Sequence, residues 1–323
     1  MSSAEAAPPP RRILCAGIMV LDEVFRVDTF PEPDGKTVAS EFFIVNGGCA
    51  ANAAVAIARL GGRVALAGPM GGPAGDDANG DLVLARLARE NVDTFACQRV
   101  AGMATALSAI FIDKSGDRMI VTYSDKRIAA IAPHDPQALT ADTDLLLADN
   151  RYPQFVRPIC EAARRRGIPV VLDGDKPTIE DDPLFRVATH VVFSAECLRY
   201  TTGLSDLGAA LTRIARHTEA FLAVSNGPND IVYLEGGTLR PIPVFKIAAV
   251  DTLGAGDALH GGFALALGEG LGEVAAMRFG AATAAIKCTR LGGSAGAPSR
   301  AEVEAFLAEH GGLAPGLAMI GLI

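Results

Sequence analysis

The sequence Asp251-Thr-Leu-Gly-Ala-Gly-Asp257 lies between an apolar run of extended character at residues 247–250 and a helix-forming run at residues 258–267. Its glycines, Gly254 and Gly256, therefore mark a place where an extended segment turns into a helix. The first turn of a helix offers unpaired backbone N–H groups and the positive end of the helix dipole. Because glycine has no side chain, an anion can approach this backbone closely. The pattern predicts an anion-binding site at the start of a helix.

Asp257 falls in the first turn of the predicted helix, next to that anion site. A carboxylate beside a phosphate is repulsive, so its presence there requires a chemical role. The role that fits is acceptance of the proton from a hydroxyl group that attacks the phosphorus atom. The alternative is that Asp251 and Asp257 are ordinary capping residues around a glycine-rich turn.

Two stretches together resemble a known family. Residues 251–257 match every fixed position of DTxGAGD, the C-terminal signature of the ribokinase-like, or PfkB, sugar kinases. Residues 46–60 resemble the N-terminal signature of that family, a Gly-Gly pair followed by a helix that carries Asn, and the two occur in the family's order. The resemblance implies that Asp257 is the catalytic base and that Gly254, Ala255 and Gly256 form an anion hole for the transferred phosphoryl group.

Composition restricts the other classes of function. The chain has 323 residues, of which 50% are hydrophobic and 20% charged, enough for one large α/β domain with an accessory element or for two domains. A formal net charge of −8 without a basic stripe argues against nucleic acid and anionic membranes as partners. The six cysteines form no CxxC pair, and no apolar run reaches membrane-spanning length. We therefore expect reduced thiols in a cytoplasmic protein.

The pattern of short apolar strands and helices predicts the domain organisation. Residues 1–12, rich in Ala and Pro, are expected to form a disordered tail, residues 13–310 one kinase domain, and residues 311–323 a C-terminal tail. From residue 145 onward, strands alternate with amphipathic helices, which indicates a mostly parallel central sheet with helices on both faces. Ligands lie beyond the carboxyl ends of such strands. Polar residues are expected at these ends: Asp22, Asp149, Asp173, Ser194 and Ser225.

Two extended pairs interrupt this alternation. One lies at residues 21–30 and 37–45, and the other, at residues 106–112 and 118–123, reads as a hairpin. We assign both to a small projecting β-sheet that covers a site as a lid or pairs with a second chain in a homodimer. The expected fold is thus a ribokinase-like α/β domain with a β-sheet lid.

The resemblance also implies binding residues for sugar and nucleotide. For the sugar it points to Asp22, Gly47, Gly48 and Asn52; for the nucleotide it points to Ser225, Gly227, Ala284, Cys288, Gly292 and Gly293. On chemistry alone the glycines are equally turn residues, and Asp22 is equally a turn former.

The chain departs from the family where magnesium is organised. Family members commonly carry Asn-x-x-Glu, but the corresponding stretch here is Ser194-Ala-Glu-Cys197. Mg²⁺ is expected because the charge of a triphosphate must be neutralised. Glu196, Asp173 and Asp175 are the candidates to hold it through water molecules, and a monovalent cation such as K⁺ is a further expected cofactor.

The altered sequence at residues 194–197 resembles that of the ketohexokinase and sulfofructose kinase branch of the family. The stretches at residues 148–151, 172–175 and 287–290 resemble the same branch. In that branch basic and amide groups hold a sulfonate, and Lys36 and Arg151 stand at matching places, whereas Thr122 stands where Asn is expected. The alternative is that Lys36 and Arg151 are ordinary surface charges, which leaves a neutral ketose or another acidic sugar open.

The leading hypothesis is an ATP-dependent kinase for a primary hydroxyl of a ketose-like sugar, including an anionic one. A nucleoside kinase of the same fold is the near alternative, although a base needs an apolar or aromatic wall and only 6% of the residues are aromatic. A catalytically silent sugar- or nucleotide-binding regulator is the alternative from another class, and the intact Asp257 argues against it. A dehydrogenase finds little support, since no GxGxxG follows the first strand.

Overall fold

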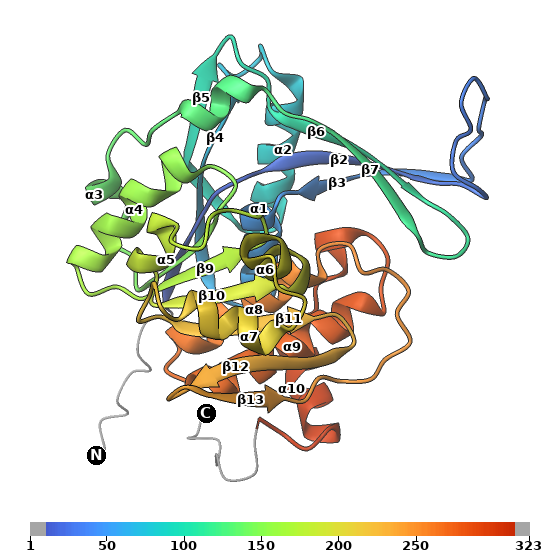
Figure 1. The fold of residues 1–323 in the computed structure, drawn as a ribbon. Helices are drawn as coiled ribbons and strands as arrows, with labels where there is room; N and C mark the ends of the chain where they lie inside the picture. Colours follow the sequence, from blue (N-terminus) through green and yellow to red (C-terminus); the bar gives the residue numbers. More distant parts are fainter. Residues whose placement is uncertain (1–10, 314–323) are drawn as a thin grey trace, which may run out of the picture.

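The computed structural model describes residues 11–313 and is built on a nine-stranded sheet (Figure 1). Its strands, in spatial order, are β13 (Thr238–Ile242), β12 (Asn229–Glu235), β11 (Phe221–Asn226), β10 (His190–Ser194), β9 (Val170–Gly174), β8 (Leu145–Asp149), β1 (Arg12–Ala16), β4 (Arg63–Gly72) and β5 (Asp93–Ala101). All neighbours from β11 to β5 pair in parallel, and β12 and β13 add an antiparallel edge. The predicted mostly parallel sheet is confirmed.

Helices cover both faces of this sheet because its strands alternate their side chains. In β1, Ile13 and Cys15 belong to one apolar core, and Leu14 and Ala16 belong to the other. The first core is closed by α1 (Cys49–Arg59), α2 (Ala78–Arg89), α8 (Ala255–Gly268), α9 (Glu273–Cys288) and α10 (Arg300–Glu309). The second is closed by α4 (Pro153–Arg165), α5 (Pro183–Val187), α6 (Ala195–Thr202) and α7 (Leu207–Ile214), with the short α3 (Pro136–Leu139) and η1 (Lys126–Ala130) packed beside α4.

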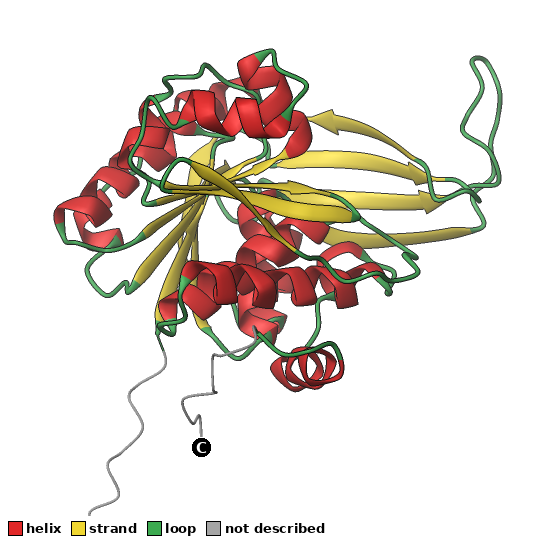
Figure 2. Ribbon diagram, turned by 60° about the horizontal axis from the view of Figure 1, so that its bottom comes forward, coloured by secondary structure: helices red, strands yellow, loops and turns green. Residues whose placement is uncertain are grey.

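A four-stranded sheet, which we call the lid, projects from this body (Figures 1 and 2). Its order is β3 (Glu41–Gly47), β2 (Val20–Arg26), β6 (Ala106–Ile112) and β7 (Arg118–Tyr123). β6 and β7 have the predicted bounds, and the turn between them is closed by the Asp113 carboxylate, which accepts from the N–H groups of Ser115 and Asp117. The predicted hairpin and projecting sheet are confirmed.

The structure places Asp22 differently from the prediction, which put it at the carboxyl end of a strand of the central sheet. β1 stops at Ala16, and β2 begins at Val20 in the lid, so Asp22 lies inside a lid strand and not at the carboxyl end of a strand of the central sheet. The break falls at Gly17, where a Cβ atom would overlap the carboxylate of Asp149. The chain therefore leaves the central sheet at this residue.

Other expected boundaries were also wrong. β4 and β5 were not expected, because β4 runs through Gly68-Pro-Met-Gly-Gly72, a composition typical of a loop; a Cβ on Gly68 would overlap the carbonyl of Gly17. Residues 247–250 form no strand, and Val250 instead donates its N–H to Cys288 O at 2.7 Å. Arg12 belongs to β1 and not to the tail, while residues 1–10 and 314–323 of the two expected tails lie outside the described residues.

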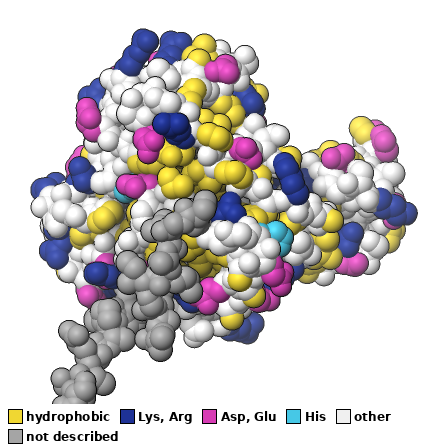
Figure 3. Space-filling view, turned by 90° about the horizontal axis from the view of Figure 1, so that it is seen from below, with side chains coloured by type: hydrophobic (Ala, Val, Ile, Leu, Met, Phe, Trp, Pro, Cys, Tyr) yellow, Lys and Arg dark blue, Asp and Glu magenta, His cyan; other side chains and the backbone are white. Residues whose placement is uncertain are grey.

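Charged side chains of both signs share the surface. On the face shown in Figure 3, basic and acidic side chains are interspersed and do not gather into a basic stripe. Between residues 11 and 313, no helix has both the length and the apolar character needed to cross a bilayer. All six cysteines lie within this range, and none of them forms a disulfide there.

Candidate active site

The predicted anion site lies at the start of α8. Gly254 is the N-cap residue and has the left-handed φ of 74°, which glycine adopts without cost. The N–H of Ala255 donates to Thr252 O at 3.2 Å and is therefore already used. Among the described residues, the N–H groups of Gly254, Gly256 and Asp257 have no partner, and a Cβ on Gly256 would meet nothing within 4 Å. The positive end of the helix thus carries amides without a partner, and the side-chain position of Gly256 beside them is open.

The carboxylate of Asp257 lies beside these amides. Asn52 of α1 donates its Nδ2 to Asp257 Oδ2 at 2.7 Å, and a Cβ on Gly254 would lie 3.6 Å from the same oxygen. Asp257 is half-buried, and its pKa is raised to about 7. Burial is the main cause and the charge of Asp173 adds to it, whereas the hydrogen bond from Asn52 lowers the pKa. A carboxyl group that titrates near neutral pH is suited to general base catalysis. Asn52, expected to bind sugar, is therefore in contact with the proposed base.

Asp251 connects two loops next to the anion site. Its Oδ1 accepts from the N–H of Leu253 at 2.8 Å, and its Oδ2 accepts from Gly292 at 3.0 Å and Gly293 at 3.2 Å. Burial tends to raise the pKa of Asp251, but the Leu253 hydrogen bond and the charge of Lys287 leave the pKa below its usual range. The carboxylate is ionised and holds the loop before α8 against η2 (Gly293–Gly296).

Several acidic groups converge near Asp257. Ligand atoms of Cys49, Asp173 and Asp257 lie within 4.8 Å of one another, and Asp175 accepts from Cys49 Sγ at 3.6 Å. Burial raises the pKa values of Cys49 and Asp173 well above their usual ranges, and neighbouring carboxylates add to both shifts. A protonated thiol is a poor ligand for a hard cation, but carboxylates suit Mg²⁺ and its water ligands. The donor set fits magnesium through Asp173 and Asp175.

Asp149 fixes the chain around this cluster. It is 1% exposed and accepts from the N–H groups of Ile18 at 2.7 Å, Arg151 at 2.9 Å and Ala50 at 3.2 Å. It therefore joins the exit of β1 to the start of α1. Arg151 forms an ion pair with Asp175, which places its guanidinium against the acidic cluster.

Asp22 faces the inner side of the lid. It is 6% exposed, burial raises its pKa to about 6, and a hydrogen bond from Ser108 opposes this shift. A Cβ on Gly47 would overlap the Asp22 carboxylate, and a Cβ on Gly48 would lie 2.5 Å from Ile18 O. The Gly-Gly pair thus leaves room for parts of the protein itself. Next to Asp22, Ser108 shares a hydrogen bond of 3.0 Å with Thr122.

Two expected site residues lie elsewhere. Lys36 is exposed in the loop between β2 and β3, which projects from the far end of the lid (Figures 1 and 2). Glu196 is exposed in the first turn of α6, whereas Ser194 caps that helix by accepting from the N–H of Cys197 at 3.1 Å. Neither Lys36 nor Glu196 reaches the buried acidic cluster in this structure, because both lie on solvent-facing segments.

The residues expected to bind nucleotide lie on three segments. Ser225 is the last residue but one of β11 and lies directly opposite Ser194 of β10, and Gly227 is exposed in the turn that follows the strand, with φ of 56°. Ala284 and Cys288 lie one turn apart on α9, and both are partly exposed although most of that helix is buried. Gly292 and Gly293 donate to Asp251, as described above.

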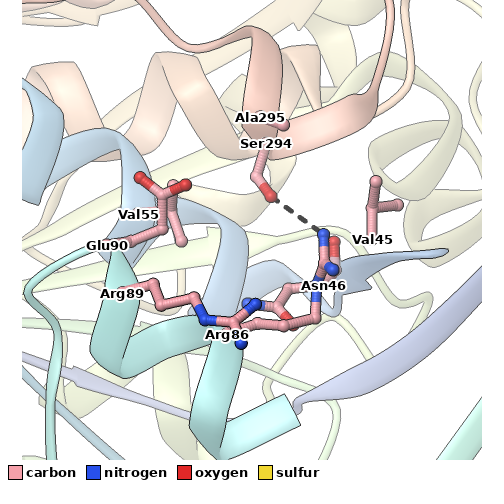
Figure 4. A pocket seen from close by; sticks show the side chains of 8 residues that line it. All are labelled: Val45, Asn46, Val55, Arg86, Arg89, Glu90, Ser294 and Ala295. Atoms are coloured by element: carbon pink, nitrogen blue, oxygen red, sulfur yellow. Dashed lines mark hydrogen bonds between the residues drawn. The ribbon is translucent and has the colours of Figure 1, made fainter. Parts of the chain in front are cut away.

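A small pocket of about 100 Å³ lies on the other side of η2 (Figure 4). Figure 4 shows Arg86, Glu90 and Asn46 around it, together with Val45, Val55, Arg89, Ser294 and Ala295. Asn46 is 5% exposed, and its Oδ1 has no hydrogen-bond partner among the described residues. We assign this pocket no catalytic role.

Little or nothing in the sequence indicated what several residues of the site do. Asp251 was expected only as part of the motif or as a cap, and Lys287 only as part of a resemblance. Ser108 lies in an ordinary alternating strand. His260 of α8, with ring nitrogens 2.8 Å from Gly256 O and 3.1 Å from Val192 O, ties the helix to β10. The only indication of this role in the sequence was the position of His260, three residues after the predicted base and therefore on the same side of the helix.

Comparisons with known proteins agree with this geometry. The model of the pfkB family carbohydrate kinases matches residues 10–300. A ribokinase of Haemophilus influenzae is 30% identical over 302 residues, which cover 91% of this chain and 97% of that protein. The solved ribokinase of Thermotoga maritima is 26% identical, with a TM-score of 0.77 and coverage of 93% and 99%. A solved structure from Agrobacterium tumefaciens is 36% identical, with a TM-score of 0.88 and coverage of 93% and 98%. This chain belongs to the pfkB family of carbohydrate kinases.

Proposed function

We propose that this kinase transfers the γ-phosphoryl group of ATP to a primary hydroxyl of a neutral sugar of about the size of ribose or fructose. The observation that carries the proposal is the half-buried Asp257 carboxylate beside the free amides at the start of α8. The relatives support it: ribokinases are similar over most of the chain, and a fructokinase of Klebsiella pneumoniae is 27% identical over 254 residues.

We assign each group of the site a role in phosphoryl transfer. Asp257 accepts the proton of the sugar hydroxyl as the oxygen attacks phosphorus, and Asn52 holds the carboxylate in place. The amides of Gly256 and Asp257 bind the oxygens of the phosphoryl group as it moves, where their dipoles need no reorientation. Mg²⁺, when bound, neutralises phosphate charge, and Asp173 and Asp175 are the residues that would hold its water ligands. The lid carries Asp22 to the sugar and excludes water.

A neutral substrate fits better than the sulfofructose suggested by the sequence. Arg151 is paired with Asp175, Lys36 is exposed on the lid loop, and Thr122 is bonded to Ser108. Of the two groups expected to recognise a sulfonate, Arg151 is thus engaged and Lys36 is exposed to solvent, and Thr122, which stands in place of the expected Asn, is engaged as well. The buried polar groups that remain near the sugar, Asp22 and Asn52, offer acceptors and amides that suit hydroxyl groups.

ADP release measured in a coupled assay tests this proposal. The panel holds ribose, fructose, sulfofructose, acidic keto-sugars and nucleosides at equal concentration, with ATP and Mg²⁺. We expect the highest kcat/KM for a neutral sugar. A preference for an acidic sugar or a nucleoside contradicts the proposed substrate, and no turnover of any member contradicts the proposed activity.

The pH dependence of the enzyme should report Asp257. Since the carboxylate is the base and its pKa is about 7, kcat/KM should rise with pH through about 7 and level off above it. Replacing Asn52 by Leu removes the hydrogen bond that lowers this pKa, so the rise should move to higher pH. Rates measured from pH 5.5 to 9 check this. A profile that is flat in this range, or unmoved by Asn52→Leu, contradicts the assignment.

We also propose that the outer face of the lid pairs with a second copy of the chain. Phe25, Phe42 and Phe111 stack there, with ring centroids 4.9 and 5.5 Å apart. Val121 and Tyr123 of the same face are 61% and 60% exposed. An apolar face on an exposed sheet is a common site of symmetric pairing.

Replacing Val121 by Glu should therefore convert a dimer into a monomer. The charge would lie in the middle of the apolar face, whereas Val121 makes little contribution to the folded monomer because it is 61% exposed. Sedimentation velocity measures the change. Ile179→Glu, at an equally exposed residue of the main body, is the control. A wild-type protein that sediments as a monomer, or a Val121→Glu dimer, contradicts the proposed interface.

A further inference from the structure

The ammonium group of Lys287 is enclosed next to the anion site. Lys287 lies in the last turn of α9 and is 0% exposed. Its Nζ donates to Asp251 O at 2.7 Å and lies 3.2 Å from Asp251 Oδ2. The general chemistry of kinases, as described above, makes no use of this group. A fully buried lysine is rare unless it has an ionic partner, so its position needs an explanation.

The partner of Lys287 is the carboxylate that holds the two loops together. Asp251 accepts from Leu253, directly before Gly254, and from Gly292 and Gly293 in the second loop. The backbone of residues 250–251 is also tied to the end of α9, because Asp251 N–H donates to Cys288 O at 3.1 Å. The ammonium is thus connected, through Asp251 and Leu253, to the loop before α8 that carries the free amides.

Stability alone does not explain a buried cation here. An ion pair removed from water gains little over well-packed apolar side chains of the same volume. A positive charge at this point does, however, fix the direction of one carboxylate and one carbonyl oxygen, and the C-terminal end of α9 favours a cation for dipole reasons. An alkali-metal ion placed between the same oxygens would do similar work, and K⁺ is close to an ammonium group in size.

We propose that the Lys287 ammonium is a built-in monovalent cation that holds the anion-hole loop in shape, so that this kinase works without K⁺. The K⁺ expected from the sequence does not fit at this loop, since the carboxylate and carbonyl oxygens of Asp251 that would bind it already contact Nζ. Lys287 is then a positioning residue that acts through Asp251. The inference rests on the anion hole of the proposed function.

The first experiment uses the wild-type enzyme. Its kcat is measured in KCl, NaCl and tetramethylammonium chloride at equal ionic strength. We expect the three rates to agree within about twofold, because the tethered ammonium makes added cations superfluous. Stimulation of tenfold or more by K⁺ overturns the proposal.

The second experiment removes the ammonium and offers a replacement. Lys287→Ala should lose about 100-fold in kcat, the effect of a small displacement of catalytic groups, with little change in the KM for sugar. Methylammonium or K⁺, but not the larger tetramethylammonium, should restore part of this rate. Lys246→Ala, which removes an exposed lysine, is the matched control and should remain near wild type. An unchanged kcat, or loss that no cation restores, overturns the positioning role.

The third measurement needs no turnover. The melting temperature of Lys287→Ala should rise on addition of methylammonium or K⁺, whereas that of the wild type should not. If wild-type protein phosphorylates no sugar, the proposed function fails, and this thermal comparison still tests Lys287. If Lys287→Ala does not fold, the wild-type salt comparison decides: equal rates support the built-in cation, and dependence on K⁺ overturns it.

Discussion

Asp257→Asn is expected to lower kcat by about 10³- to 10⁴-fold while the affinity for ADP stays close to that of the wild type. Asparagine keeps the size of the side chain and can still contact Asn52, but it cannot accept the hydroxyl proton at neutral pH. The free amides of Gly254 and Gly256 are unaffected, so phosphate binding should persist. Single-turnover kinetics give the rate, and calorimetric titration with ADP gives the affinity.

The control for this variant is Asp76→Asn, because Asp76 is an exposed aspartate in the loop before α2. It should leave both the rate and the affinity unchanged. A rate for Asp257→Asn within tenfold of the wild type would show that the proton goes elsewhere, and equal loss of ADP affinity would point to a structural role for the carboxylate.

Asp251→Ala should have the largest effect on stability, a loss of about 3–5 kcal/mol in the free energy of unfolding. The substitution leaves the Lys287 ammonium buried without a carboxylate and removes the acceptor of three backbone N–H groups. A buried charge without its partner is far more costly than the absence of both members of the pair. Urea unfolding followed by circular dichroism measures the loss.

The double variant Asp251→Ala, Lys287→Met separates the buried charge from the lost hydrogen bonds. Removing the ammonium as well should recover a large part of the stability, but kcat should stay low because the two loops are no longer joined. If the two substitutions add in their effect on stability, the charges of Asp251 and Lys287 are not coupled, and the interpretation of the pair is wrong.

Several elements of the fold could be predicted because residues close together in the sequence determine them. Residues 251–257 predicted a helix start with Asp257 in its first turn, and α8 begins at Ala255. The hairpin at residues 106–123 was predicted with the observed bounds, because its turn residues and alternating strands agree. Local pattern also explains α10, because the capping box of Ser299 and Glu302 accounts for the start of that helix at Arg300.

The failures have a common cause, namely contacts between segments distant in the chain. Asp22 was assigned to the end of a central strand because nothing local shows that Gly17 must make room for Asp149. In the sequence, Gly68 of β4 looks like a loop residue because the backbone for which it leaves room, that of Gly17, comes from a distant segment just after β1. The role of Asp251 depends on Lys287, which lies 36 residues away. Patterns of neighbouring residues carry no information on such pairs.

The surroundings of three charged residues could not be predicted from the sequence, for a related reason. Lys36 and Glu196 were chosen because they stand at or near positions of a family motif, yet both lie on solvent-facing segments. Arg151 does reach the site, but Asp175 neutralises it. A sequence shows which charges are present, whereas the pairing of those charges decides what they recognise.

The division of the two carboxylates between the lid and the main body has a consequence for fidelity. Asp22 belongs to the projecting sheet and Asp257 to α8, so a sugar bound as we propose would have to bridge the lid and the main body. A deoxy analogue that lacks the hydroxyl facing Asp22 should then react slowly even at saturating concentration. It contacts the main body alone and does not hold the lid over the site. Water is too small to contact both carboxylates at once, so on this proposal it should be a poor acceptor, and hydrolysis of ATP without sugar should be slow.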